Sequence, residues 1–152
     1  MKIKPLKLYL DLCVYNRPFD FQGYDRIALE SNAFIYLLEK IENKNYSLVV
    51  SDALFYENNK NPNDQKKKQI FSYFKLAKEN IKIDNFDIKR AKELIKLGFN
   101  EMDALHIAVA EKSKTDYFIT CDDKIVKLYR KHNNLIRTKI SNILEFIALE
   151  VI

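Results

Sequence analysis

The chain has 152 residues, of which 47% are hydrophobic and 31% charged, and this composition suits one globular domain spanning residues 1–152. No apolar run is long enough to cross a bilayer or precedes Asp11 as a signal peptide, so we expect a cytoplasmic protein with no membrane contact. With only two glycines, the chain has neither the GxGxxG nor the GxxxxGK[ST] motif, which excludes Rossmann oxidoreductases and P-loop NTPases. The net charge of +5 favours a polyanionic partner such as nucleic acid.

The first predicted element is a strand over residues 6–11, read as LKLYLD. Alternating apolar residues that run into an aspartate are typical of a parallel strand with a functional residue at its carboxyl end. Pro18 and Gly23 then predict a surface loop over residues 12–24. Cys13, like Cys121 later in the chain, has no metal-finger spacing, and we expect both to be free thiols.

Strands and helices alternate along the rest of the chain. The further expected strands are residues 47–51, 80–84, 116–120 and an edge strand at 135–138. The expected helices are residues 25–42, a helix from Ser51, 64–78, a helix from Asp87 to Gly98, 100–112, 121–131 and a last helix from Ser141. The expected N-caps are Asp25, Ser51, Asp87, Asp123 and Ser141. This alternation predicts a three-layer α/β/α sandwich around a mostly parallel sheet of four to five strands.

Acidic residues follow the predicted strands or face inward on helices. They are Asp11, Glu57, Asp103 and Asp122. We expect all four to converge on the carboxyl end of the first strand. Two carboxylates about 4 Å apart repel by about 4 kcal/mol in a protein-like dielectric, so such a cluster needs a cation. Oxygen ligands without a cysteine or histidine pair favour Mg²⁺ or Mn²⁺ over Zn²⁺.

The order of these acids resembles that of the PIN-domain family of nucleases, including its VapC-like toxin ribonucleases. The fragments that carry the resemblance are YLDLCVYNRPFD, SDALFYE, MDALHIAVAE and YFITCDDKIV. The opening D-x-C-x-x-N-R-P-x-D is similar to that of one bacterial and archaeal subgroup. Together the fragments span nearly the whole chain.

The resemblance implies a sheet of order 3-2-1-4-5 and metal-dependent cleavage of single-stranded RNA. It further implies a toxin of a type II toxin-antitoxin pair, a homodimer, and a cognate antitoxin as partner. By the same resemblance, the four acids become both the metal ligands and the catalytic residues. Thr120 and Asn16 become residues that orient the ligands, and Arg17 becomes a phosphate-binding residue, unless it is a solvated loop charge.

Several other side chains allow two interpretations. Lys66, Lys67 and Lys68 form either a solvated helix face or contacts to RNA phosphates. Tyr15, Phe19 and Tyr24 either stack on bases or pack against the sheet edge. His106 either lies in the cleft with Asp103 or is a core histidine with satisfied hydrogen bonds, which we favour.

The alternatives to a toxin are a housekeeping RNA-processing nuclease and a non-catalytic RNA-binding or scaffolding module with the same fold. Intact acids argue against the non-catalytic module. A phosphatase of the haloacid-dehalogenase kind also places an aspartate after the first strand. Its second carboxylate belongs two residues later, where this chain has Cys13, and we therefore disfavour it.

Overall fold

A parallel five-stranded sheet forms the centre of the computed structural model, which describes residues 4–152. The strand order is β3-β2-β1-β4-β5, as the resemblance implied. All four neighbouring pairs are parallel. The strands are β1 (Leu6–Leu10), β2 (Tyr46–Ser51), β3 (Glu79–Ile81), β4 (Tyr117–Thr120) and β5 (Lys139–Asn142). Because the strands are parallel, their carboxyl ends meet at one edge of the sheet.

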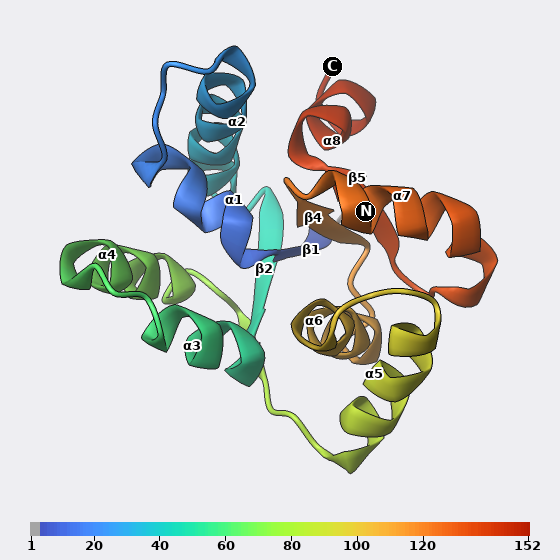
Figure 1. Ribbon diagram of the computed structural model, residues 1–152. Helices are drawn as coiled ribbons and strands as arrows, with labels where there is room; N and C mark the ends of the chain where they lie inside the picture. Colours follow the sequence, from blue (N-terminus) through green and yellow to red (C-terminus); the bar gives the residue numbers. More distant parts are fainter. Residues whose placement is uncertain (1–3) are drawn as a thin grey trace.

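Helices occupy both faces of the sheet (Figure 1). They are α1 (Leu12–Asn16), α2 (Asp25–Glu42), α3 (Asp52–Asn59), α4 (Asp64–Phe74), α5 (Asn85–Lys96), α6 (Glu101–Lys112), α7 (Asp123–His132) and α8 (Ile143–Glu150), with 3₁₀ turns η1 (Arg17–Phe19) and η2 (Asn133–Leu135). Helices α2 and α8 pack together on one face, and α5 and α6 pack on the other. The predicted three-layer α/β/α sandwich is therefore confirmed.

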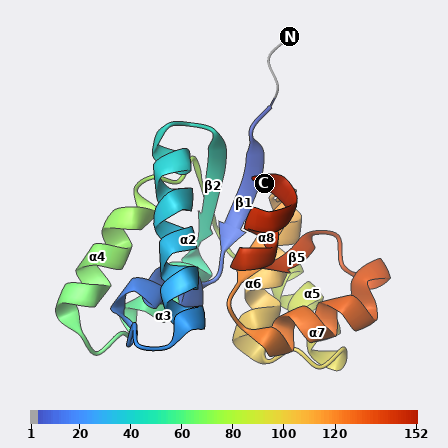
Figure 2. The same cartoon turned by 90° about the horizontal axis from the view of Figure 1, so that it is seen from above.

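The most buried helix is α6, as expected from its apolar residues on nearly every side. Its residues 106–111 are all buried, and Ala104 also belongs to the core. The sheet face toward α6 includes Tyr9 and Phe118, both fully buried and stacked on each other, and the Tyr9 hydroxyl lies 2.6 Å from Nδ1 of His106. Figure 2 shows β1 and β2 running toward the end of the molecule where α1 and α3 lie. The carboxyl ends of the strands, near which α1 and α3 lie, are therefore next to a buried core.

The segment after β1 is not the loop that we predicted. Residues 12–16 form α1, and η1 continues to Phe19. Two features stabilise this short helix, since Asp11 accepts a hydrogen bond from the Leu12 N–H (2.8 Å) and Tyr15 is fully buried. Pro18 lies within η1, and the irregular segment that we predicted from Pro18 and Gly23 is limited to residues 20–24.

Of the five predicted N-caps only Ser51 is correct, and the first two errors concern α2 and α5. The N-cap of α2 is Tyr24 rather than Asp25, and it makes no side-chain capping bond. The N-cap of α5 is Asp84, which accepts hydrogen bonds from the N–H groups of Phe86 and Asp87. The Asp87 carboxylate in turn accepts from the Asp84 N–H, which completes a capping box. At the other end of α5, Gly98 has φ +117°, the predicted left-handed termination.

The edge strands differ most from the prediction. Helix α4 ends at Phe74 instead of residue 78, since the Lys78 N–H already donates to the Leu48 carbonyl where β3 joins β2. The third strand ends before Asp84, at Ile81.

The last strand also lies later than predicted. β5 covers Lys139–Asn142 rather than residues 135–138. Ser141 therefore lies within a strand, and Asn142 caps α8 by accepting from the Leu144 N–H (2.7 Å). Within residues 4–152, no helix is both long enough and apolar enough to span a bilayer.

Candidate active site

Asp11 lies at the junction of β1 and α1, where its carboxylate is buried and hydrogen-bonded. One oxygen caps α1, and the other accepts from the Thr120 hydroxyl at 2.9 Å. The Cys13 thiol lies 3.4 Å from the same oxygen, and neither Cys13 nor Cys121 is in a disulfide, as predicted. Burial raises the pKa of Asp11, against the lowering effects of His106 and Thr120.

Thr120 connects Asp11 to the turn after β4. Its hydroxyl oxygen accepts a hydrogen bond from the Asp122 N–H at 3.0 Å while its proton goes to Asp11. These contacts match the orienting role expected for Thr120. Asn16, the other residue expected to orient the ligands, is half-buried, and its side-chain oxygen is buried without a hydrogen-bond partner.

Glu57 enters the site from α3, which Ser51 caps as predicted. One ligand atom from each of Asp11, Glu57 and His106 lies within 4.8 Å of the other two. Two carboxylates from β1 and α3 and an imidazole from α6 therefore meet in one place. This group contains two of the four acids that we expected to converge on the end of the first strand.

Asp103 lies in the first turn of α6, after the N-cap Asn100. Burial, and after it the negative charges of Asp11, Asp122 and Glu57, together raise the pKa of Asp103 to about 7. The four predicted acids are therefore electrostatically coupled, although Asp103 and Asp122 belong outside the 4.8 Å group found among residues 4–152.

Asp122, not Asp123, is the N-cap of α7. Its carboxylate accepts from the Lys124 N–H at 2.9 Å, so this residue combines the capping role with its place beside Asp103. Asp123 instead forms a bidentate pair with Arg26, at 2.8 and 2.6 Å. We predicted that Asp123 caps the helix and that Asp122 belongs to the site. In the structure it is Asp122 that caps the helix.

Arg17 is committed to carboxylates of its own chain. Its guanidinium donates to Glu30 and to Asp20, each at 2.9 Å. Its side chain is only 21% exposed. These contacts favour a structural role for Arg17 over the phosphate contact that the resemblance implied.

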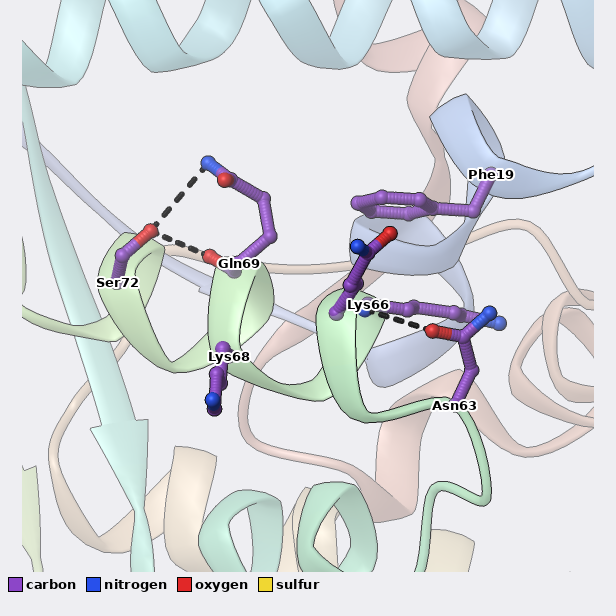
Figure 3. Close-up of a pocket in the computed structure, with 7 residues that line it drawn as sticks. Phe19, Asn63, Lys66, Lys68, Gln69 and Ser72 are labelled. Carbon is purple, nitrogen blue, oxygen red and sulfur yellow. Dashed lines mark hydrogen bonds between the residues drawn. The ribbon is translucent and has the colours of Figure 1, made fainter.

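Lys66 and Lys68 line an open groove on α4 with Phe19, Gln69 and Ser72 (Figure 3). The groove has a volume of about 520 Å³. Lys67 instead lies 3.9 Å from Asp64.

The aromatic residues of the first loop separate into two kinds. Tyr15 is fully buried, which supports the packing interpretation over stacking on bases. Phe19 and Tyr24 are exposed and remain available for contacts with a partner.

His106 lies closer to the site than we expected from the sequence. It is a buried, hydrogen-bonded histidine, as we favoured, yet its Nε2 lies 3.0 Å from Glu57 and its Nδ1 2.6 Å from the Tyr9 hydroxyl. Its spacing of three residues from Asp103 was the available signal. The histidine is therefore both part of the core and part of the site.

The site residues fit a hard divalent cation. Within residues 4–152, no lysine or arginine forms an ion pair with any of the four acids, and burial and mutual repulsion raise the pKa of Asp103 and Asp11. Clustered carboxylates without a basic partner suit an external cation with oxygen ligands.

The metal-free protein is expected to lose stability as pH rises from about 4 to about 7 because of Asp103. Its folded-state pKa lies above the unfolded value, so its protonated form favours the folded state and its ionised form opposes it. In EDTA, Asp103→Asn should match the wild-type free energy of unfolding near pH 4 and exceed it above pH 7. Urea denaturation across this range measures the difference, with exposed Asp52→Asn as the control. An equal difference at both ends of the range would contradict the shift.

The fold and the acid cluster define a class of parallel α/β proteins with a carboxylate site at the carboxyl edge of the sheet. The chain belongs to the PIN domain family, since the sequence profile of that family matches residues 26–131. Glu57, Asp103 and Asp122 lie inside the matched segment. Asp11 precedes it, and the Thr120 hydrogen bond connects it to the rest of the site.

One solved structure with the same fold is VapBC2 from Rickettsia felis bound to a DNA fragment from its promoter. The TM-score is 0.56 at 15% sequence identity, over 90% of this chain and 98% of the other. At this identity the likeness concerns the fold. Among curated proteins, none matches the chain.

Proposed function

We propose that the protein is a divalent-metal-dependent endoribonuclease that hydrolyses phosphodiester bonds of single-stranded RNA. The observation that carries the proposal is the group of acids at the sheet edge: ligand atoms of Asp11 and Glu57 lie within 4.8 Å of each other, and burial together with the charges of Asp11 and Asp122 raises the pKa of Asp103 to about 7. Membership of the PIN domain family supports the same reaction class. The net charge of +5 supports a polyanionic substrate.

In this proposal Asp11, Glu57, Asp103 and Asp122 would hold Mg²⁺ or Mn²⁺. Such an ion makes a bound water more acidic and stabilises negative charge on the phosphate oxygens. Thr120 holds the Asp11 carboxylate and the Asp122 backbone in a fixed relation. Because Asp11 also caps α1, its carboxylate is fixed before any substrate arrives.

Cleavage of a fluorescent single-stranded RNA tests the proposal directly. Activity is expected with Mg²⁺ or Mn²⁺, absent in EDTA, and restored when metal is added back. Cleavage that persists in EDTA would refute metal dependence. Binding of Mn²⁺ without cleavage of any RNA would favour the non-catalytic module instead.

We also propose that the groove lined by Lys66, Lys68 and Phe19 carries part of the RNA. The groove lies on α4, which packs against the helix that carries Glu57, since the Asn58 amide of α3 donates to the Lys67 carbonyl of α4 at 3.0 Å. Two lysine ammonium groups suit phosphates, and an exposed phenylalanine suits a base.

Replacing Lys66 and Lys68 together by glutamine should make RNA binding less dependent on salt. Each phosphate contact to a single strand contributes about 0.7 to the slope of log K against log salt concentration, so the double variant should lose a slope of about 1.4. Fluorescence anisotropy in EDTA, where the RNA stays intact, measures the slope. Lys89→Gln on the distant α5 is the control. An unchanged slope in the double variant would remove the groove from the RNA path.

We further propose that the protein is the toxin of a type II toxin-antitoxin pair, with an antitoxin protein as partner and a homodimer as its active form. The fold shared with VapBC2 of Rickettsia felis supports this assignment. Expression of the protein should arrest growth, and co-expression with the protein encoded beside it should restore growth. Growth that continues at full expression of the wild type would favour the housekeeping nuclease.

A further inference from the structure

A chain of buried hydrogen bonds runs through the core and ends on Glu57. The Ser51 hydroxyl lies 2.6 Å from the Tyr9 hydroxyl, which lies 2.6 Å from Nδ1 of His106. The other ring nitrogen of His106 lies 3.0 Å from Oε1 of Glu57. Ser51, Tyr9 and His106 are each fully buried. Side chains from β2, β1, α6 and α3 are thus joined in one line.

The chemistry of these groups fixes which atom donates in each bond. An ionised carboxylate only accepts, so Nε2 of His106 donates to Glu57. In the neutral ring Nδ1 then accepts, and the Tyr9 hydroxyl must donate to it. Tyr9 has one proton, so its oxygen accepts from Ser51, whose own oxygen accepts from the Leu54 N–H. Every polar atom in the line is satisfied with ionised Glu57 and neutral His106.

This arrangement leaves His106 without a free nitrogen. Although the ring lies within 4.8 Å of the ligand atoms of Asp11 and Glu57, both nitrogens are already engaged, to Tyr9 and to Glu57. A cation bound to His106 would have to break one of these bonds. The histidine therefore acts on the carboxylate and not on an ion.

We propose that Tyr9 is a positioning residue of the acid cluster, which acts through His106 to hold the Glu57 carboxylate toward Asp11. The Glu57 side chain is 33% exposed and has several rotatable bonds, so it needs an external constraint to keep one orientation. Hydrogen-bond partners behind metal ligands commonly change metal affinity by 10- to 100-fold. The inference rests on the proposed metal site.

The substitution Tyr9→Phe tests the proposal because it removes one oxygen from a fully buried ring. Calorimetric titration with Mn²⁺ should show affinity reduced about tenfold. Tyr15→Phe is a matched control, since Tyr15 is also fully buried but its hydroxyl has no hydrogen-bond partner. Equal Mn²⁺ affinity in the two variants and the wild type would overturn the proposal.

A double-mutant cycle shows whether Tyr9 acts through Glu57. In a Glu57→Gln background, Tyr9→Phe should have no further effect on Mn²⁺ affinity. A tenfold loss in both backgrounds would show that Tyr9 acts elsewhere and would overturn the proposal. Wild type that binds no Mn²⁺ would instead reject the proposed metal site.

Nitrogen NMR of the imidazole tests the arrangement in the metal-free protein, whatever the metal titration gives. The wild-type ring of His106 should carry its proton on Nε2, and Tyr9→Phe should change the chemical shift of the unprotonated Nδ1, which loses its hydrogen-bond donor. A wild-type proton on Nδ1 would overturn the assigned direction of the line, and with it the proposal.

Discussion

Replacing Asp11 by asparagine is expected to reduce RNA cleavage at least about a thousandfold while the fold persists. A metal ion contributes several kcal/mol of transition-state stabilisation, and losing about 4 kcal/mol corresponds to a factor of about a thousand. Asparagine is as good an N-cap as aspartate, so the bond from the Leu12 N–H that begins α1 can be retained. The loss should therefore appear in the turnover of RNA and not in the circular dichroism.

The same substitution should also lower the pKa of Asp103. After burial, the Asp11 charge is the largest cause of the shift to about 7. Asp103→Asn should cause a comparable loss of cleavage. Asp52→Asn, an exposed aspartate in the first turn of α3, is the control and should cleave like the wild type. If RNA is still cut at the wild-type rate by both the Asp11 and the Asp103 variants, these acids do not form the catalytic site.

The inner strands could be predicted because their signals are local and strong, whereas the strand order followed from the family resemblance. The runs LKLYL in residues 6–10 and LVV in residues 48–50 are buried toward their carboxyl ends, as expected for central parallel strands. The predicted bounds of the edge strands were wrong because the hydrophobic pattern of these strands is weak. β3 has no fully buried residue over Glu79–Ile81, so burial places no constraint on its register.

The N-caps show a second limit of sequence reasoning. Asp84 and Asp87 are three residues apart, and both participate in the capping box, so the sequence offers two equally good starts for α5. Asp122 and Asp123 are adjacent, and the choice depends on Arg26, a residue 97 positions away that binds Asp123. Composition and spacing carry no information about such a distant partner.

The four acids could be proposed from the sequence, but the side chains that hold them in place could not. Asp11 follows a strand, Asp103 and Asp122 lie at helix starts, and Glu57 faces inward on α3, so these positions are recognisable in the sequence. Tyr9 and His106 look like ordinary core residues in the sequence, and only the tertiary fold shows that their polar atoms end on Glu57. The role expected for Arg17 changes for the same reason, since its partner Glu30 is hidden inside α2.

Replacing Glu30 by alanine is expected to destabilise the protein by about 3–5 kcal/mol, the usual effect of leaving a buried ion pair without one partner. The Glu30 side chain has 0% exposure. It accepts from Arg17 at 2.9 Å and from the Asn142 amide at 2.8 Å, and Arg26 lies 3.5 Å away. Glu30 thus connects η1 and α2 to the end of β5, and its loss leaves the Asn142 amide without this acceptor.

Thermal and urea unfolding should show this loss as a melting temperature lower by about 10 °C for a chain of this size. Glu30→Gln separates charge from volume, because it keeps the shape but places an NH₂ group against one of the donors that the carboxylate satisfies. It should therefore lose most of the same stability. The control Glu39→Ala lies on the exposed side of α2 and should change the free energy of unfolding by less than about 0.5 kcal/mol. If Glu30→Gln is as stable as the wild type, Arg17 is not held by Glu30, and its guanidinium is again available for the phosphate contact that the family resemblance implied.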